Sequence, residues 1–393
     1  MGWASRRVFL TQAGSGLALS GCQSGVARAH VAVFDAMWKA FDEWYFDPTL
    51  NGIAWKAVRR NWRPRAAEAP TQAALYLDVL VPVLERFQTS HIEIRPPGVL
   101  ELASGRSFTM PRQKRGSSFV MLTREDEAGM GAVFTWTGSA FVVEDVALGG
   151  PAHAAGLRPG QSVRLASFSL PGDRREIQLV ERGGAKFTVK WTPKVAEPQT
   201  DWSVLDGRAP RLRFDVFDQP SVEWAIRRLG AAAFQPVVLD LRKNTGGLIV
   251  EMWRLLSAIL PEGSEIGRFQ DRKRTSRPET APLATRFTGP LAVLIGPRTS
   301  SGGEITAAAL QHHARARLFG ARTSGSVLAS RTFDLPDGGK LTIPFAEYLT
   351  PAGVRIEDEG VNPDVAAPRT VVSMAEGRDP ALDAAGDWLR TRQ

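Results

Sequence analysis

The stretch LAVLIGPRTSSGGEITAAALQHHA, residues 291–314, holds the transition that decides the fold. It begins with the unbroken apolar run Leu291–Ile295, which predicts a strand buried on both faces. A Gly-Pro-Arg turn ends the run, and the segment EITAAALQHHA that follows is rich in helix formers. We expect Thr299 or Ser300 to cap this helix. Ser301 therefore lies where a buried strand gives way to a helix N-terminus.

The position of Ser301 suits a nucleophile that generates an oxyanion. Backbone N–H groups point outward at a helix N-terminus, and the helix dipole favours negative charge there. Gly302 and Gly303 follow directly. A plain capped loop is the alternative interpretation of so short a motif, and the rest of the chain has to decide between the two.

Strands alternate with helices over residues 199–393. The buried run PVVLDLR, Pro236–Arg242, is broken by NTGG and followed by the helical segment LIVEMWRLLSAIL. The strand at residue 291 and the helix after Ser301 repeat this unit. The alternation predicts an α/β core with a mainly parallel sheet, whose sites lie beyond the C-terminal ends of the strands. Both Gly246–Gly247 and Ser301 fall at such ends.

The region before the core divides into three parts. Residues 30–96 carry apolar side chains at helical spacing and predict an N-terminal helical domain. Residues 97–117 are rich in Pro, Gly, Ser and Arg, which is typical of a linker. Residues 118–193 contain short strands, and between two of them lies GGPAHAAGLRPGQ, Gly149–Gln161. This segment resembles the loop-helix-turn of bacterial PDZ domains, except that Gln161 replaces an acid.

A PDZ domain would supply a groove that takes an extended peptide by adding it to a sheet edge. The alternative is a generic β-rich insertion. The length of the match favours the PDZ interpretation of residues 118–193.

The N-terminus has the features of an export address. SRRVFL, Ser5–Leu10, resembles a twin-arginine signal, and LSGC, Leu19–Cys22, resembles a lipoprotein signal-peptidase box. These resemblances imply that residues 1–21 are a signal peptide, that Cys22 is lipidated, and that residues 22–29 are a tether. Gln23 follows the cysteine in place of Asp, which implies outer-membrane retention. No stretch reaches the ~20 apolar residues that span a bilayer.

Composition sets limits on the function. The chain has 393 residues, 43% of them hydrophobic, and a formal net charge of +8. The positive charge is scattered, with short basic patches at residues 59–65 and 272–277, which we interpret as solvated faces attracted to anionic envelope surfaces. No nucleic-acid motif accompanies them, and we expect neither a metal nor a cofactor. Cys22 is the single cysteine, so an intramolecular disulfide is excluded.

A serine hydrolase needs a general base, and His91 is the candidate that elimination leaves. His312 and His313 lie on the helix of Ser301, roughly 16–18 Å along it at 1.5 Å rise per residue, and cannot reach the serine. His153 belongs to the PDZ-like loop, and His30 lies near the tether. A purely structural role is the alternative for His91, which comes from the helical domain.

Taken in order, the motifs resemble the family of C-terminal processing and tricorn-core serine peptidases. The resemblance covers nearly all of the expected mature chain and runs through WYFDPTLNGIAW, SHIEI, VVLDLRKNTGG, TSSGGEITAAALQ, RLFGARTSG, EDEGVNPD and GRDPALDAAGDWL. It implies a helical N-terminal domain, a PDZ domain and an α/β core. It also implies that Ser301 is the nucleophile and that Gly302 with Gly246 or Gly247 donates to the oxyanion. Three further residues would shape the loop: Asp240, Arg242 and Asn244.

One position departs from the better-known members of this family. Ser-Lys processing peptidases carry T-F-G-K-G after the next strand, whereas this chain has TSGSV with Ser326 at the position of the lysine. The tricorn-type arrangement offers another base, a Ser-His pair from the helical domain that a glutamate orients. Ser90 and His91 match the pair, and Glu357 matches the glutamate, with Glu359 as the alternative.

The sequence therefore predicts a lipid-anchored, periplasm-facing serine endopeptidase that captures peptides or proteins through a PDZ groove. An inactive peptide-binding scaffold of the same fold is the alternative, and a lipid-binding relative is disfavoured because Ser301, His91 and Glu357 all remain. No nucleic-acid partner is expected. The substrate, the cleavage preference, adaptor partners and the oligomeric state stay open.

Overall fold

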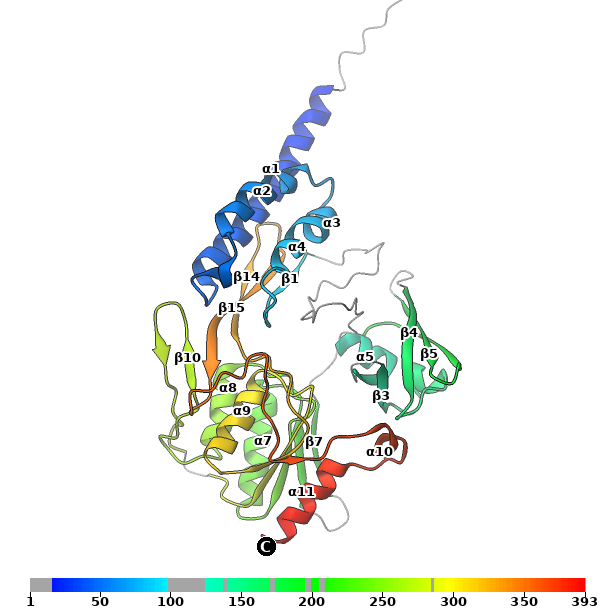
Figure 1. The fold of residues 1–393 in the computed structure, drawn as a ribbon, viewed down its shortest axis with the longest axis vertical. Helices are drawn as coiled ribbons and strands as arrows, with labels where there is room; N and C mark the ends of the chain where they lie inside the picture. Colours follow the sequence, from blue (N-terminus) through cyan, green and yellow to red (C-terminus); the bar gives the residue numbers. More distant parts are fainter. Residues whose placement is uncertain are drawn as a thin grey trace, which may run out of the picture.

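The computed structural model contains three β-sheets, a helical N-terminal region and helices on both faces of the central sheet (Figure 1). It describes residues 16–97, 124–136, 140–169, 174–194, 199–204, 209–283 and 286–392. Most of the expected signal peptide and all but the first residue of the expected linker lie outside these ranges.

The helical region forms around its own hydrophobic core. It comprises α1 (Gly16–Trp44), the short 3-10 helix η1 (Leu50–Gly52), α2 (Trp55–Glu68), α3 (Gln72–Ala74), the π-helical segment η2 (Leu75–Leu80) and α4 (Val81–Leu84). The rings of Phe41, Tyr45, Trp55 and Phe87 pack together at its centre, with centroids 4.5–5.7 Å apart. These contacts fix α1 against α2 and against the segment that leads to Ser90.

The helical region is joined to the core by a strand that the sequence analysis did not predict. β1 (Glu93–Arg95) pairs antiparallel with the N-terminal half of β15 (Lys340–Leu349). The far half of β15 pairs with β10 (Arg268–Gln270), which also pairs with β11 (Thr275–Ser276), and β14 (Ala329–Asp334) lies beside β15. Leu341 and Ile343 of β15 are buried in the core of the helical region. One continuous strand therefore belongs to both parts of the molecule.

The central sheet has the strand order β16-β13-β12-β9-β8-β7. Its strands are β7 (Thr200–Ser203), β8 (Arg211–Phe214), β9 (Val237–Asp240), β12 (Leu291–Ile295), β13 (Arg317–Gly320) and β16 (Val365–Ala366). Four neighbouring pairs are parallel, and β7 with β8 is antiparallel. The other two sheets pair only antiparallel in the ranges described, so pairing is largely antiparallel over the molecule. The prediction of a mainly parallel sheet was therefore too broad.

The strand over residues 291–295 is buried on both faces, as predicted. Leu291, Val293 and Ile295 pack with α7 (Gln219–Ala232), α8 (Ile249–Ser257) and α9 (Gly302–His312). Ala292 and Leu294 face the opposite side, where α11 (Pro380–Arg390) covers the sheet. Alternation of side chains along a strand gives each helical layer its own set of contacts. The remaining helix, α10 (Val371–Ala375), precedes α11.

Residues 124–194, with the gaps given above, form a separate body that we call the β module. Its sheet has the order β2 (Ala132–Trp136), β3 (Phe141–Val146), β4 (Ser162–Ser169), β5 (Arg175–Glu181) and β6 (Lys186–Trp191). The helices α5 (Arg124–Met130) and α6 (Pro151–Ala154) accompany it, and its hydrophobic core is separate from the others. The module lies beside the central sheet (Figure 1).

Candidate active site

Ser301 lies at the predicted transition between β12 and α9 and is itself the N-cap of the helix, in place of Thr299 or Ser300. Its backbone has φ 53° and ψ −119°, a region that residues other than glycine rarely adopt. Thr299 instead holds the turn from within: its buried hydroxyl donates to the Leu241 carbonyl at 2.9 Å and accepts from the Gly296 N–H at 3.0 Å. The strained backbone of Ser301 therefore follows a turn that the hydrogen bonds of Thr299 hold in place.

Gly246 lies directly against Ser301. A Cβ built on Gly246 would lie 2.5 Å from the Ser301 Cβ and 2.9 Å from its Oγ, and φ at Gly246 is +89°. Any side chain there would displace the serine. The close approach explains why a glycine pair follows the buried strand β9.

Asn244 builds the loop that carries Gly246. Its side chain is fully buried, donates to the Phe214 carbonyl at 3.1 Å and accepts from the Gly246 N–H at 2.9 Å. Its backbone carbonyl accepts from the Ser300 N–H at 3.0 Å. Asn244 therefore positions the glycine loop and the serine turn at the same time.

The N–H groups of the three expected oxyanion donors are not equivalent. That of Gly246 is already donated to Asn244. Those of Gly247 and Gly302 have no acceptor among the residues that the structure describes. Because Gly302 is the first residue of α9, its N–H also lies at the positive end of the helix dipole.

Asp240 and Arg242 form a buried ion pair at the end of β9. The guanidinium donates to both Asp240 oxygens, at 2.9 and 2.6 Å, and to both Asp379 oxygens at 2.8 Å. Burial of Asp240 would raise its pKa, but Arg242 outweighs that effect and lowers the pKa to about 2. Asp379 caps α11, so Arg242 links the end of β9 to α11, the helix that covers the face of the sheet opposite α7, α8 and α9.

Glu304 is a buried carboxylate that the sequence analysis did not single out. It accepts from the hydroxyls of Thr323 and Ser324 at 2.5 and 3.0 Å, and from the N–H groups of Gly325 and Ser326 at 2.7 and 2.8 Å. It also accepts from the Ser301 N–H at 3.2 Å. Burial raises its pKa, and the hydrogen bonds oppose that shift. The sequence signal for Glu304 was an acid at the third position of a capped helix, but the sequence does not show that this acid is buried.

Ser326 contacts the serine turn through its backbone. Its carbonyl accepts from the Ser301 N–H at 2.8 Å, while its own N–H goes to Glu304. The position that carries the lysine in Ser-Lys peptidases is therefore beside Ser301 in this chain. A hydroxyl occupies it, and the N–H of Ser301 is fully used by Ser326 and Glu304.

Ser90, His91 and Glu357 come together from opposite ends of the chain. The Ser90 hydroxyl lies 2.7 Å from His91 Nδ1, and the Ser90 N–H donates to Glu357 Oε1 at 3.3 Å. The Glu357 side chain thus contacts the backbone of Ser90. Burial lowers the pKa of His91, and the Glu357 charge opposes this shift. A lowered pKa keeps the imidazole neutral at neutral pH, the form that can accept a proton.

Glu357 also connects this group to the serine turn. Its Oε2 accepts from the N–H of Val327 at 2.8 Å, and Val327 follows Ser326, whose carbonyl binds Ser301. Glu357 is fully buried, whereas the side chain of Glu359 is 73% exposed and lies 4.0 Å from Arg322. Of the two glutamates considered from the sequence, Glu357 is the one that contacts Ser90.

The other histidines lie elsewhere. His313 Nε2 lies 2.8 Å from the Glu265 carbonyl. The His312 ring packs edge-on against the His313 ring at the C-terminal end of α9. His30 is buried within α1, and His153 lies in α6 of the β module. Within the described ranges, no cluster of His, Cys, Asp and Glu side chains could hold a metal ion.

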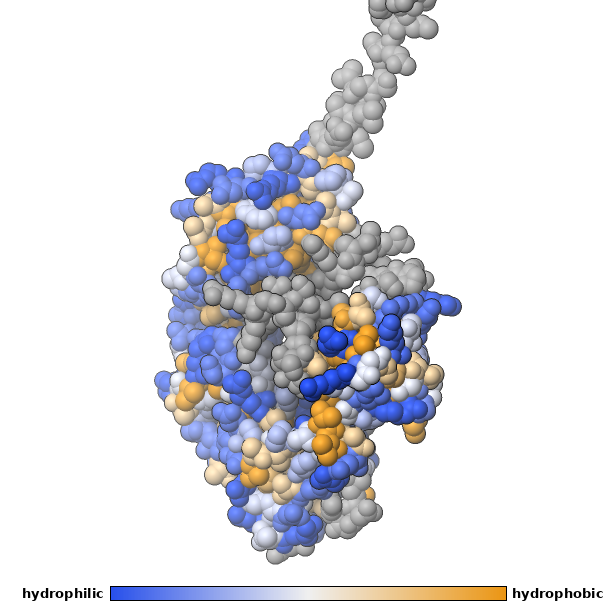
Figure 2. All heavy atoms as spheres, turned by 45° about the vertical axis from the view of Figure 1, so that its right-hand side comes forward, coloured by the Kyte–Doolittle hydropathy of each residue, from blue (hydrophilic) through white to orange (hydrophobic). Residues whose placement is uncertain are grey.

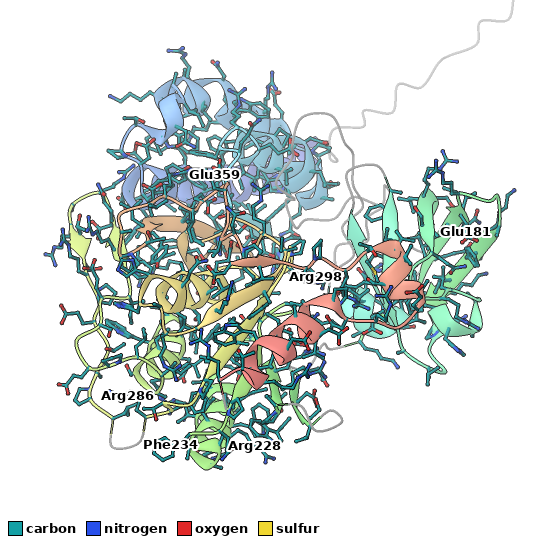
Figure 3. The ribbon with its side chains drawn as sticks, turned by 60° about the horizontal axis from the view of Figure 1, so that its bottom comes forward. Glu181, Arg228, Phe234, Arg286, Arg298 and Glu359 are labelled. Atoms are coloured by element: carbon teal, nitrogen blue, oxygen red, sulfur yellow. The ribbon has the colours of Figure 1, made fainter. Side chains whose placement is uncertain are left out.

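Ion pairs attach the β module to the loops of this site. Arg298, in the turn before Ser301, donates to both oxygens of Glu127 in α5, at 2.7 and 2.6 Å. Lys243, next to Asn244, pairs with Asp145 of β3 at 3.0 Å. Figure 3 shows Arg298 on the side of the core that faces the module. The module therefore contacts both loops that surround Ser301.

None of the helices in the described ranges combines the length and apolar content that a membrane crossing requires. Cys22 falls within α1, and residues 1–15 of the expected signal peptide lie outside the described part of the chain.

Comparison with known proteins gives relatives for most of the chain. The carboxyl-terminal-processing protease of Picosynechococcus sp. is 26% identical over 91% of this chain and 88% of the relative. The chloroplastic carboxyl-terminal-processing peptidase 2 of Arabidopsis thaliana is 25% identical over 88% of this chain and 70% of the relative. The solved structure of the photosystem II D1 C-terminal processing protease superposes with a TM-score of 0.60 at 23% identity, over 90% of this chain and 99% of that one.

Two family models match the parts that carry the site. The tricorn protease C1 domain matches residues 29–80 of the helical region. The peptidase family S41 model matches residues 212–367, from β8 past the loop of Glu357. Residues 212–367 therefore match peptidase family S41, and with the relatives this match supports a serine-type peptidase.

Proposed function

We propose that the chain is a cell-envelope endopeptidase in which Ser301 is the nucleophile and His91 the general base. The observation that carries the proposal is the hydrogen-bonded connection from His91 through Ser90, Glu357 and the 326–327 backbone to Ser301. The names of the relatives support proteins processed near their C-termini as the substrate class.

The chemistry follows from the contacts. Because Nδ1 of His91 is engaged by Ser90, Nε2 is the nitrogen left to take the Ser301 proton as the serine oxygen attacks the peptide carbonyl. The oxyanion would receive hydrogen bonds from Gly247 and Gly302. The protonated His91 then gives its proton to the leaving amine, and water hydrolyses the acyl-enzyme by the same route. The Glu357 charge favours the imidazolium that forms on the way.

The experiment that tests this proposal is labelling of the purified chain with a fluorophosphonate probe. The unmodified chain should be labelled at Ser301, Ser301→Ala should not be labelled, and His91→Ala should be labelled far more slowly. Labelling that persists in Ser301→Ala at the same rate would refute the assignment of the nucleophile. An unlabelled, folded wild-type chain would favour the inactive peptide-binding scaffold instead.

We assign substrate capture to the β module, interpreted as a PDZ domain over residues 118–193. Supporting this, β2 is an edge strand of its sheet, to which an extended peptide can add. Deletion of residues 118–193 should raise KM for protein substrates while Ser301 remains reactive to the probe. Lost labelling in a folded deletion would mean that the module assembles the site instead.

We further propose that Cys22 carries a lipid anchor and that the twin-arginine segment directs export, with retention at the outer membrane. The support is the sequence pattern LSGC followed by Gln23. Cys22→Ala should release the chain from the membrane fraction, and Arg6→Lys with Arg7→Lys should block export. A Cys22→Ala chain that stays fully in washed membranes would show that the anchor lies elsewhere.

A further inference from the structure

A shallow basic groove runs along the helical region between α1 and α2. Its lining comprises Val31 of α1 and six residues of α2, and its volume is about 640 Å³. Four of the α2 residues are cations separated by three or four positions: Lys56, Arg59, Arg60 and Arg63. Like charges at these spacings repel each other on a helix, and the one acid of α2, Glu68, is its last residue. This clustering of cations therefore destabilises α2.

The protein neutralises only part of this charge. Asp35 of α1 pairs with Arg59 at 3.2 Å and with Arg63 at 3.0 Å. Lys56 and Arg60 are exposed and have no carboxylate within ion-pair distance in the part of the chain that the structure describes. Four cations and one carboxylate leave three positive charges on the groove. Guanidinium and ammonium groups in this arrangement match the oxygens of phosphate esters.

The groove lies toward the N-terminal end of α1. The Trp55 ring stacks on Trp38, Arg63 reaches Asp35, and Ala67 lines the groove opposite Val31, so α2 runs antiparallel to α1. Val31 is nine residues from Cys22, or about 14 Å along a helix. In Figure 1 the N-terminal turns of α1 extend away from the body beyond α2. Figure 2 shows hydrophilic and apolar residues side by side at the upper end of the body.

We propose that this groove binds the phosphate headgroups of anionic lipids and holds the helical region against the membrane surface. The orientation rests on the anchor proposed at Cys22, since a single attachment leaves the body free to tilt and a basic patch is the usual second signal. The groove is open and shallow, which suits a flat array of phosphates better than one enclosed soluble anion. Attraction of this kind falls with salt and extends over about one Debye length.

The test measures binding of the full chain, carrying Cys22→Ser so that no lipid is attached, to vesicles. Vesicles of phosphatidylcholine with and without phosphatidylglycerol show whether binding depends on anionic lipid, and the charge variants separate binding by the groove from binding by the leader, which carries Arg6 and Arg7 in every variant. The groove variant combines Lys56→Glu with Arg60→Glu, and a second combines Lys56→Gln with Arg60→Gln. The matched control combines Arg164→Glu with Lys186→Glu, two exposed residues on strands of the β module, which makes the same change in net charge.

The Cys22→Ser chain should bind the phosphatidylglycerol vesicles in a salt-sensitive manner, and the Lys56/Arg60 charge reversal should weaken this binding about tenfold or more. The control should stay near the parent, and labelling of Ser301 should be the same in all variants. Equal loss in groove variant and control, or no phosphatidylglycerol dependence, would overturn the proposal. Competition by millimolar inorganic phosphate would assign the groove to a soluble anion instead. Because Ser301 labelling is read separately, failure here leaves the peptidase proposal intact.

Discussion

The buried carboxylate of Glu357 accepts the backbone N–H of Ser90 across 267 residues of chain. This contact joins the helical region to the α/β core, because Glu357 also holds the Val327 N–H beside the serine turn. His91 and Ser301 come from two bodies that fold around separate hydrophobic clusters. Their relative placement therefore depends on a few polar contacts and on the strand β15 that both bodies share.

The first prediction tests which glutamate supports His91. Glu357→Gln keeps the size of the side chain but removes the charge that favours the imidazolium, so kcat should fall by about 10- to 100-fold while KM changes little. Glu359→Gln is the matched control, since its side chain is largely exposed, and kcat should stay within about twofold. A larger loss in Glu359→Gln than in Glu357→Gln would reverse the assignment.

The second prediction concerns the pH dependence of the base. The unperturbed pKa of a histidine is about 6.5, and burial lowers that of His91. The acidic limb of kcat/KM, which reports the free enzyme, should therefore lie below pH 6.5. In Glu357→Gln the limb should move further toward acid pH, because the charge that raises the pKa is gone.

His91→Ala should lower kcat by about 100- to 10,000-fold, the usual worth of a general base. Ser326→Ala should cost little, because Ser326 contacts Ser301 through its backbone carbonyl, which alanine keeps. A Ser326→Ala chain as inactive as Ser301→Ala would show that the hydroxyl takes part in the reaction, and the role of His91 would have to be reconsidered.

Another prediction concerns the contact between Gly246 and Ser301. A methyl group at Gly246 would lie 2.5 Å from the Ser301 Cβ on a backbone with positive φ, so Gly246→Ala should abolish probe labelling. Gly230→Ala is the control: Gly230 lies in α7 with no atom within 4 Å of the added carbon. That control should keep full activity and raise the free energy of unfolding by about 0.4–1 kcal/mol. Retained labelling in Gly246→Ala would mean that the loop relaxes freely.

Much of the core was readable from the sequence because it depends on local pattern. The apolar run at residues 291–295 and the helix formers after Ser301 are found as a buried strand and α9. These elements bury apolar faces at the periods that the sequence displays. The separation of a helical region from strand-rich segments followed from the same periods.

The parts that could not be read depend on contacts between distant residues. SHIEI looked like the end of a helix, but Ile94 pairs with Leu341 of β15 in a strand only three residues long. The five hydrogen bonds of Glu304 come from residues 301–326, and nothing local distinguishes a buried acid from an exposed one in the first turn of a helix. The prediction of a mainly parallel sheet was too broad because a second sheet, made of β1, β10, β11, β14 and β15, is antiparallel.

A further prediction concerns the ion pair between Glu127 and Arg298. Its two side chains are 14% and 28% exposed, so salt screens it less than a surface pair. If the β module captures substrate, Glu127→Gln should raise KM for a protein substrate severalfold and leave the rate of Ser301 labelling unchanged. Glu181→Gln, on the same module without an ion pair to the core in the described ranges, is the control. A slower labelling rate in Glu127→Gln alone would instead assign the module a role in shaping the serine turn.

The last prediction concerns Glu304, which holds the strained backbone of Ser301. Five donors converge on its two oxygens, and Glu304→Gln would place an NH2 group where one oxygen accepts hydrogen bonds. An NH2 group at the Oε2 position would remove the acceptor that Ser301 and Ser326 share, and one at the Oε1 position would remove the acceptor of the Gly325 N–H. Either replacement would loosen the serine turn. We therefore expect kcat to fall by about 10-fold or more, with KM nearly unchanged, because the loss concerns the geometry of the nucleophile.

The free energy of unfolding should respond to Glu304→Gln differently from kcat. Burial raises the pKa of Glu304, so its contribution to stability is greatest below the unfolded pKa and declines as pH rises through the folded one. Replacement by a neutral amide removes this pH dependence along with the cost of a buried charge. Thermal unfolding followed at acid and neutral pH should show the variant losing less stability at neutral pH than at acid pH, while the loss of kcat persists at both. If the loss of kcat followed the loss of stability across pH, Glu304 would be a structural residue and would not position Ser301.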